Sequence, residues 1–321
     1  MVFFLYNILI ELIKDSKKMK TIDYLNTLLC NNVKCWGNTD KALEMLTETY
    51  GIKVSVYEDC LYVLNYSQID SPKNHKITNE CRSLVVCVTY VGDNNFPEFE
   101  LVSRAFDRFY NYGEIPFPHK IDKLEAHEKM DGSLVTLWYD DTCMGEWAYR
   151  TRSMIMPENE INNWDRTWKD LIEKSLGTNY PDNLNKEFSY IFEVTSQENR
   201  VVVRYPENKP ATLLAIRHIR SGEYVNVDSV DYQAEFNGWD RPKRYKFDTA
   251  EEAQEAALAL PNLEEGYVMY RGGKAIGKMK NPAYVAAHHL RGEGLNPKRL
   301  LQLVWVRLMS TCQCSLKMTR C

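Results

Sequence analysis

The stretch His127-Glu128-Lys129-Met130-Asp131-Gly132-Ser133-Leu134-Val135-Thr136-Leu137-Trp138-Tyr139 places a lysine two residues before a carboxylate, with Gly-Ser and an apolar-rich run directly behind them. Because side chains alternate along a β-strand, Lys129 and Asp131 are expected on one face. Gly132 permits a tight turn or a close approach of the backbone to a ligand. An ordinary turn feeding a strand has the same pattern, so a lysine nucleophile requires charged groups elsewhere in the chain.

Length and composition describe an ordinary globular protein rather than a polycation. The chain has 321 residues, 44% of them hydrophobic and 26% charged, with 40 Lys and Arg against 44 Asp and Glu. This is enough chain for one large domain or two smaller ones. Residues 271–321 differ, because ten Lys and Arg there face a single acid, Glu293. This segment suits a local contact with phosphate or nucleic acid, or else forms a solvated helical end.

The cysteines and the N-terminus indicate a cytoplasmic protein without a membrane span. The nine cysteines form no Cys-x-x-Cys pair, which indicates free thiols in a reducing compartment. Residues 2–13 are apolar but interrupted by Asn7 and Glu11, and they lack the basic start and cleavage site of a secretion signal. They form either an amphipathic helix or an extension upstream of a true start at Met19.

Periodicity predicts antiparallel strands with inserted helices, which is typical of the α+β class. Helices are expected over 19–29 and over 40–50, the second capped by Thr39 or Asp40 and followed by Gly51. A later helix is expected over 158–176, and a short one begins at the capping box of Thr249 and Glu252. Strands are expected in a hairpin over 54–64, then over 84–91, 99–103, 134–139, 147–152, 190–195, 201–204 and 212–218, with a loop over 65–79.

The segment 265–280 reads as a second hairpin. Gly272-Gly273 between two alternating runs is a two-residue turn signal, so residues whose numbers sum to 545 are expected to face each other. Tyr267 then opposes Lys278, and Glu265 opposes Lys280. Because directly paired residues lie on the same side of a sheet, Glu265, Tyr267, Lys278 and Lys280 are expected on one charged face. This face could bind phosphates together with a metal ion or a ribose, although a solvent-exposed face of mixed charge is the simpler alternative.

Six motifs follow one another along the chain: Glu80-Cys81-Arg82, Ser103-Arg104 through Phe109-Tyr110-Asn111, Lys129 to Val135, Ile191-Phe192-Glu193 with Asn199 to Val202, Glu265 to Val268, and Lys278-Met279-Lys280. Taken in this order, they resemble the ATP-dependent RNA ligase 1 family of T-even-like bacteriophages, within the lysine nucleotidyltransferase superfamily that includes DNA ligases and mRNA-capping enzymes. The resemblance covers roughly residues 50–295. The residues around Glu80 and Tyr284 to His288 favour RNA ligase 1 over other branches.

The resemblance implies a reaction and its cofactors. Lys129 would attack the α-phosphate of ATP to form lysyl-AMP, and the adenylate would pass to an RNA 5′-phosphate before a 3′-hydroxyl displaces AMP. Mg²⁺ or Mn²⁺ would accompany ATP, with Glu265 placing the metal or the lysine. Because a free lysine titrates near 10.4, Lys278, Lys280 and the metal are expected to lower the pKa of Lys129.

The resemblance also assigns nucleotide contacts. Arg82 and Arg108 would contact sugar and phosphates, Tyr110 would stack on adenine, and Glu193 would bind the ribose hydroxyls. Taken alone, Glu193 could equally form a structural ion pair and Arg82 a surface charge. The full set of implied nucleotide-binding residues is Arg82, Arg108, Tyr110, Glu128, Gly132, Arg152, Glu193, Lys278 and Lys280.

The chain departs from the family at single positions and at its end. Ser83 stands where relatives often have Gly, and Arg108 and Arg152 stand where they tend to carry Lys. We expect a nucleotidyltransferase (ligase adenylylation) domain over 1–283, with 1–50 as a helical lead-in, and a truncated C-terminal helical segment over 284–321. A monomer acting on single-stranded or nicked RNA or tRNA is expected. The alternatives are a DNA ligase, a capping-type enzyme or a non-catalytic RNA-binding remnant.

Overall fold

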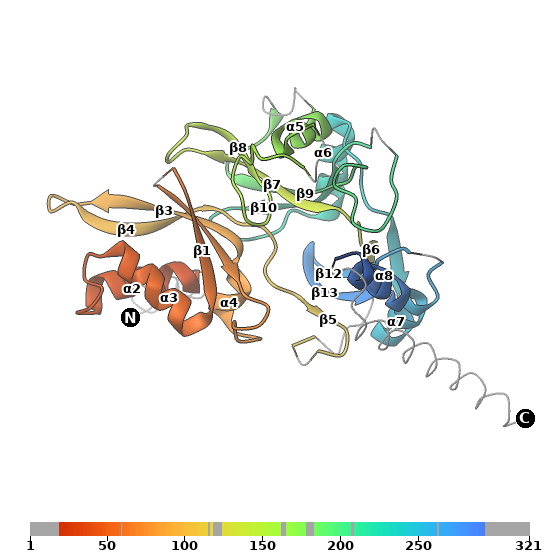
Figure 1. Ribbon diagram of the computed structural model, residues 1–321, viewed down its shortest axis with the longest axis horizontal. Helices are drawn as coiled ribbons and strands as arrows, with labels where there is room; N and C mark the ends of the chain where they lie inside the picture. The colour runs from red at the N-terminus through yellow and green to blue at the C-terminus, as the bar shows by residue number, and fades with distance from the viewer. Residues whose placement is uncertain are drawn as a thin grey trace, which may run out of the picture.

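The computed structural model describes residues 19–292, except 59, 115, 118–123, 162–164, 178–182, 207–208 and 262. It has the expected α+β class, with three mainly antiparallel sheets and helices against them (Figure 1). Residues 1–18, and residues 293–321 of the C-terminal helical segment expected over 284–321, lie outside the described residues. Within the described chain, no helix has the length and apolar character needed to cross a bilayer.

The first sheet has the strand order β1-β2-β3-β4 and carries helices on one face. Its strands are β1 (Ile52–Tyr57), β2 (Leu61–Tyr66), β3 (Arg82–Val91) and β4 (Phe96–Ser103), and the helices are α2 (Lys20–Asn31), α3 (Thr39–Tyr50) and α4 (Lys76–Glu80). Leu25, Leu29 and Leu46 pack onto this face with Leu64 and Leu84. The helices and strands thereby bury one shared apolar core.

Local sequence signals explain most of this region. The side chain of Asn38, not Thr39 or Asp40, caps α3, and Gly51 ends the helix with a left-handed φ of 63°. The loop expected over 65–79 is partly wrong, because β2 extends to Tyr66 and α4 occupies residues 76–80. A contact between residues far apart in the sequence holds this short helix, since the side chain of Glu80 accepts hydrogen bonds from backbone N–H groups of α2.

The second sheet has the order β10-β9-β7-β8, and α5 and α6 pack on its outer face. Its strands are β7 (Ser133–Asp140), β8 (Glu146–Arg150), β9 (Phe188–Val194) and β10 (Thr212–His218), and the helices are α5 (Trp168–Leu176) and α6 (Val227–Asn237). On its other face, Trp138 and Ala148 pack against Val63 and Val85 of the first sheet. The second sheet is therefore covered on both sides.

Two predictions fail in this region. The helix expected over 158–176 begins only at Trp168, because Glu160 bridges back to Thr167, and Thr167 with Asp170 forms a capping box. Gly177 does end it, as expected. The strand expected over 201–204 is absent, since the backbone N–H groups of Val202 and Val203 donate to the side chain of Asp131 rather than to a neighbouring strand.

The third sheet has the order β11-β6-β12-β13-β5. Its strands are β5 (Tyr110–Asn111), β6 (Leu124–Glu128), β11 (Arg244–Phe247), β12 (Gly266–Arg271) and β13 (Lys274–Lys280), with α7 (Ala250–Leu258) and α8 (Pro282–Gly292) alongside (Figure 1). Thr249 caps α7 as expected. Ala253 and Ala257 of α7 pack with Tyr267 and Met279, which fixes one face of β12 and β13 as core.

The β12–β13 hairpin keeps the expected register only beside its turn. Arg271 pairs with Lys274, but an irregularity between Met269 and Tyr270 shifts the pairing by one residue, so that Val268 opposes Lys278. Tyr267 consequently lies in the core and does not share a face with Lys278 and Lys280, contrary to the prediction. The contact expected between Glu265 and Lys280 is nevertheless present, at 2.8 Å.

Candidate active site

A pocket of about 160 Å³ lies between the second and third sheets. Polar residues from five separate elements or connectors converge on it: Arg82, Glu128, Lys129, Glu193, Lys278 and Lys280. Apolar residues complete its wall: Phe106, Phe109, Met130, Leu134, Leu214, Val268 and Tyr270. The pocket thus joins an apolar wall to a dense group of charges, which suits a ligand with a flat ring and phosphates.

Lys129 lies in the connector through which the chain leaves β6 of the third sheet for β7 of the second. Its backbone N–H donates to the carbonyl oxygen of Gly266 at 2.8 Å, and its Nζ lies 2.8 Å from Glu265 Oε2. The other oxygen of Glu265 accepts from Lys280 Nζ, also at 2.8 Å, and Glu265 is only 4% exposed. One buried carboxylate is therefore shared between two lysines.

This pairing corrects the expected electrostatics of Lys129. Burial alone lowers its pKa, but the charges of Glu265 and Glu193 and the hydrogen bond to Glu265 outweigh burial and raise it. The prediction that Lys278, Lys280 and a metal lower the pKa of Lys129 is wrong for the two lysines, because the charges of Glu265 and Glu193 outweigh them. The lowered pKa belongs to Lys278, which burial, Arg82 and the other two lysines bring to about 7.

Asp131 does not share a face with Lys129, because residues 129–131 are not in a strand. Its carboxylate turns into the protein and is 3% exposed. It accepts hydrogen bonds from Tyr284 Oη at 2.5 Å and from the backbone N–H groups of Val202 and Val203 at 2.8 and 2.7 Å. Asp131 thus fixes the lysine connector to α8 and to the chain that follows β9.

Gly132 makes the close approach that its lack of a side chain allows. A Cβ there would lie 2.4 Å from the carbonyl oxygen of Val194, a distance that real side chains do not adopt. The N–H of Gly132 donates to Glu193 Oε1 at 3.0 Å. Burial raises the pKa of Glu193 to about 7, against the opposing attraction of Lys129. Glu193 is thereby held beside the lysine on the end of β9.

Five residues expected at the site are not among those that line this pocket. Gly132 and Glu265 lie directly behind it, bonded to the lining residues Glu193, Lys129 and Lys280, whereas the other three lie elsewhere. The guanidinium of Arg108 lies 4.1 Å from the ring centre of Tyr66 and 5.2 Å from that of Tyr110, and Arg152 lies 5.0 Å from Tyr66. The hydroxyl of Tyr110 donates to Asn79 Oδ1 at 2.6 Å. Arg108, Tyr110 and Arg152 therefore belong to a neighbouring cluster of arginine and tyrosine side chains.

The aromatic wall was missed from the sequence, although a signal for part of it was present. Phe109 directly precedes Tyr110 in the motif that was singled out, and the guanidinium of Arg82 lies 4.5 Å from its ring centre. Whether Phe109 or Tyr110 lines the pocket depends on how the connector between β4 and β5 is oriented, which the sequence does not show. Leu214 had no such signal, because it lies at an irregularity of β10 between Leu213 and Ala215.

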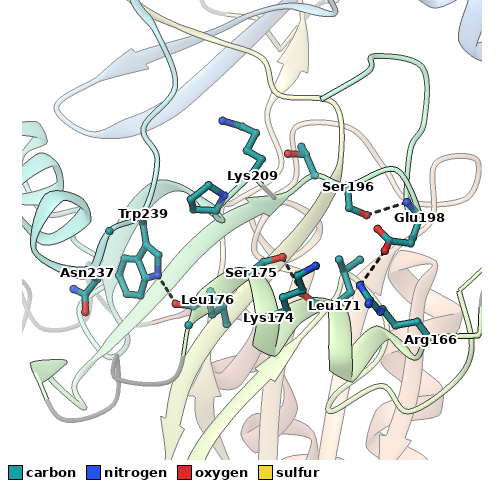
Figure 2. Close-up of a pocket in the computed structure, with 14 residues that line it drawn as sticks. Arg166, Leu171, Lys174, Ser175, Leu176, Ser196, Glu198, Lys209, Asn237 and Trp239 are labelled. Atoms are coloured by element: carbon teal, nitrogen blue, oxygen red, sulfur yellow. Dashed lines mark hydrogen bonds and ion pairs between the residues drawn. The ribbon is translucent and has the colours of Figure 1, made fainter. Parts of the chain in front are cut away.

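A larger cavity of about 300 Å³ lies beside α5 and the end of α6 (Figure 2). Two of its cationic side chains are in ion pairs, Arg166 with Glu198 at 3.0 Å and Lys209 with Asp240, and Lys174 lines the cavity beside them. Trp239 Nε1 donates to the carbonyl oxygen of Leu176 at 2.7 Å. In the described part of the chain, no cluster of three or more His, Cys, Asp or Glu that could hold a metal ion is found at either cavity.

Comparisons with known proteins agree with the chemistry of the smaller pocket. A family model described as RNA ligase matches residues 80–284. The putative bifunctional polynucleotide kinase/RNA ligase of Autographa californica nuclear polyhedrosis virus is 31% identical over 281 residues, which cover 81% of this chain and 38% of the relative. The RNA ligase of Rhodothermus phage RM378 is 23% identical over 286 residues, which cover 70% of this chain and 63% of the relative.

The chain spans less than two thirds of the length of either relative. Among solved structures, an archaeal ATP-dependent RNA ligase (form 2) is similar with a TM-score of 0.49 and 14% identity, covering 76% of this chain and 65% of that one. The family match itself spans more than half of the chain and contains Lys129, Glu193, Glu265 and Lys280. On that match, the chain belongs to the RNA ligase family.

Proposed function

We propose that this protein is an ATP-dependent RNA ligase that joins RNA 5′-phosphate and 3′-hydroxyl ends, with Lys129 as the nucleophile. The observation that carries the proposal is the convergence of Lys129, Lys278, Lys280 and Arg82 on one small pocket with an apolar wall. Four cationic groups exceed what the neighbouring carboxylates neutralise locally, which suits a polyphosphate. Membership of the RNA ligase family supports RNA as the nucleic acid.

In the first step, a bond forms between Lys129 Nζ and the α-phosphorus of ATP. The bond from that phosphorus to the oxygen that bridges to the β-phosphate breaks, and pyrophosphate leaves. Lys129 must lose a proton beforehand, and its pairing with Glu265 opposes that loss. Nucleotide binding therefore has to exchange this contact for contacts to the phosphates. Lys280 and Arg82 would stabilise the negative charge that develops on the transferred phosphate, because fixed charges need no reorganisation during the reaction.

The residues present fit a divalent metal that arrives with the nucleotide. Mg²⁺ is commonly held by one or two carboxylates together with substrate phosphates. Glu265, with its two buried oxygens facing the lysines, would hold it, and Mg²⁺ or Mn²⁺ would neutralise phosphate charge when bound. Both lysine contacts of Glu265 would have to weaken on metal binding.

For the other nucleotide contacts, we propose that Arg82 and Lys278 bind phosphates and that Glu193, held by Gly132, accepts hydrogen bonds from the ribose. Glu128 lines the pocket beside Lys129. Phe109, rather than Tyr110, would stack on the base, because Phe109 lines the pocket. The Arg108–Tyr110–Arg152 cluster would contact an RNA substrate or the nucleotide only after a rearrangement.

We place repair of broken RNA or tRNA by a monomer in a host cytoplasm as the biological role, with 1–283 as the adenylyltransferase domain and 284–321 as part of a C-terminal helical region. The relatives come from a virus and a phage, which supports this setting. The bond between Tyr284 and Asp131 means that the start of this C-terminal region contacts the nucleotidyltransferase domain directly.

The test is intact mass spectrometry after incubation with Mg²⁺ and ATP, GTP or dATP. Wild-type protein should gain the mass of one AMP from ATP, and Lys129→Ala should gain none. Lys129→Arg is the matched control, because it keeps the charge opposite Glu265 without a lysine nucleophile. Transfer of the AMP to 5′-phosphorylated RNA but not to nicked DNA would establish RNA as the nucleic acid substrate. If the protein bound RNA but formed no lysine-linked AMP, the proposal would be wrong, and the protein would be a non-catalytic RNA-binding remnant of a ligase.

A further inference from the structure

Residues 104–109, the connector between β4 and β5, have no regular secondary structure, yet they supply Phe106 and Phe109 to the pocket wall. Strand hydrogen bonds do not fix these residues. The N–H of Arg108 donates to the carbonyl oxygen of Asn79 at 2.7 Å, and side-chain contacts hold the connector further. Asp107 of the connector does not line the pocket and is contacted by three cationic side chains.

Arg217, on β10 of the second sheet, makes the strongest of these contacts. Its Nη1 and Nη2 donate to the two oxygens of Asp107 at 2.9 and 3.1 Å, which is the bidentate geometry that arginine forms with carboxylates. Nη1 also donates to the carbonyl oxygen of Ala105 at 2.5 Å, and Nε donates to that of Gly222 at 3.0 Å. Arg217 is only 3% exposed, so all three of its nitrogens are engaged within the protein.

The third sheet contributes a second contact to the same carboxylate. Lys274, at the turn between β12 and β13, lies 3.6 Å from Asp107 Oδ2, and Arg104 of the connector lies 3.7 Å from Oδ1. Burial alone would raise the pKa of Asp107, but the charge and hydrogen bonds of Arg217 lower it, so the carboxylate stays ionised. One carboxylate thereby ties the connector to both sheets that enclose the pocket.

The same anchor supports the aromatic wall. Tyr224 stacks on Phe106 with a centroid distance of 6.1 Å and an interplanar angle of 18°, and the guanidinium of Arg217 lies 4.6 Å from the ring centre of Tyr224. Arg217 therefore contacts the connector directly at Asp107 and Ala105 and indirectly through the ring that Phe106 packs on.

We propose that Asp107 and Arg217 are a positioning pair that sets the aromatic wall of the nucleotide pocket, with Lys274 as its link to the third sheet. The proposal rests on the proposed function of that pocket. Neither residue of the pair lines the pocket, so the pair acts through Phe106 and Phe109 and through the placement of Arg82, whose guanidinium lies over Phe109. A substitution that weakens the ion pair between Asp107 and Arg217 should weaken nucleotide binding more than it slows the bond-forming step at Lys129.

The test compares Arg217→Lys, Asp107→Asn and Lys274→Met with wild type, measuring lysyl-AMP formation over a range of ATP concentrations, ATP affinity by calorimetry, and the melting temperature. Lysine cannot reproduce the guanidinium fork, and asparagine keeps the shape of aspartate but not its charge. For Arg217→Lys and Asp107→Asn, KM for ATP should rise on the order of tenfold while kcat changes much less. For the exposed Lys274→Met, the rise should be smaller, about twofold to threefold.

Arg166→Lys is the matched control, because it makes the same change in an arginine–carboxylate pair that lines the other cavity (Figure 2). Its KM for ATP should equal that of wild type. A fall in melting temperature with unchanged KM in Arg217→Lys or Asp107→Asn would overturn the proposal and leave a purely structural pair. Should both fail to fold, an unchanged KM in Lys274→Met would overturn it and a raised KM would support it. If wild type binds ATP but forms no lysyl-AMP, the proposed function fails, and the affinities still decide the positioning role.

Discussion

The two cavities described above differ in size and in how their charges are arranged, and the proposed chemistry lies in the smaller one. They lie beside neighbouring parts of the chain, since Glu193 lines the pocket of about 160 Å³ and Thr195 lines the cavity of about 300 Å³. In the larger cavity, each described acid–base pair is one to one, as with Arg166 and Glu198. In the smaller pocket, Glu265 is shared by two lysines.

On the proposed function, crowded like charges mark the reactive site better than volume does. Holding several cations together costs free energy that the protein recovers only when an anion binds. The pKa of Lys278, lowered to about 7 by burial and neighbouring cations, is one sign of that cost. The one-to-one pairs of the larger cavity are satisfied without a ligand and need no functional explanation.

The largest expected contrast comes from removing one paired lysine at each cavity. Lys280→Met should reduce lysyl-AMP formation by about 10²-fold or more, because it removes a fixed positive charge and leaves Glu265 to pair with Lys129 alone. Lys209→Met removes the partner of Asp240 in the larger cavity and should change the rate by less than about twofold. Single-turnover rates with labelled ATP measure both. Equal losses in the two variants would remove the distinction between the cavities.

The sequence was sufficient for the residue types of the reactive pocket but not for all of its walls. Most of the helix and strand periodicity and the lysine motif could be predicted, because they depend on local patterns. The contact of Glu265 with Lys280 is present, although the register from which it was predicted is shifted by one residue there. The register of the β12–β13 hairpin could not be predicted. Its irregularity comes just before Gly277, where a Cβ would lie 2.2 Å from the ring of Phe117, so packing from outside the hairpin restricts it.

Contacts between residues far apart in the sequence were the other feature that could not be predicted. Nothing local in the sequence joins Asp107 to Arg217, or Asp131 to Tyr284, across more than a hundred residues. The sign of the pKa shift of Lys129 depended on such distances too. The cations beside it were correctly identified, but the approach of Glu265 to 2.8 Å decided the outcome.

A smaller effect should appear in the pH dependence of stability. Burial raises the pKa of Glu193 from 4.5 to about 7, so the folded protein binds this proton at pH values where the unfolded chain has released it. The stability that neutral Glu193 contributes is complete below the unfolded pKa and is lost as pH rises through about 7. Glu193→Gln cannot ionise, so its melting temperature relative to wild type should increase from about pH 5 to about pH 8. If the difference in melting temperature between the two proteins stayed constant over that range, the prediction would be wrong, and Lys129 would fully compensate the negative charge of Glu193.

The smallest effect is expected at the hydroxyl of Thr195, which lines the larger cavity. Its Oγ1 is buried without a hydrogen-bond partner in the structure, and the residue is 2% exposed. Thr195→Val replaces that hydroxyl with a methyl group of similar shape and removes a buried polar group that gains nothing from burial. The free energy of unfolding should therefore stay the same or rise by about 1 kcal/mol, with lysyl-AMP formation unchanged. Chemical denaturation measures the first quantity and the ATP assay the second. A marked loss of either would mean that this hydroxyl binds a ligand or an ordered water, and the larger cavity would then need a function of its own.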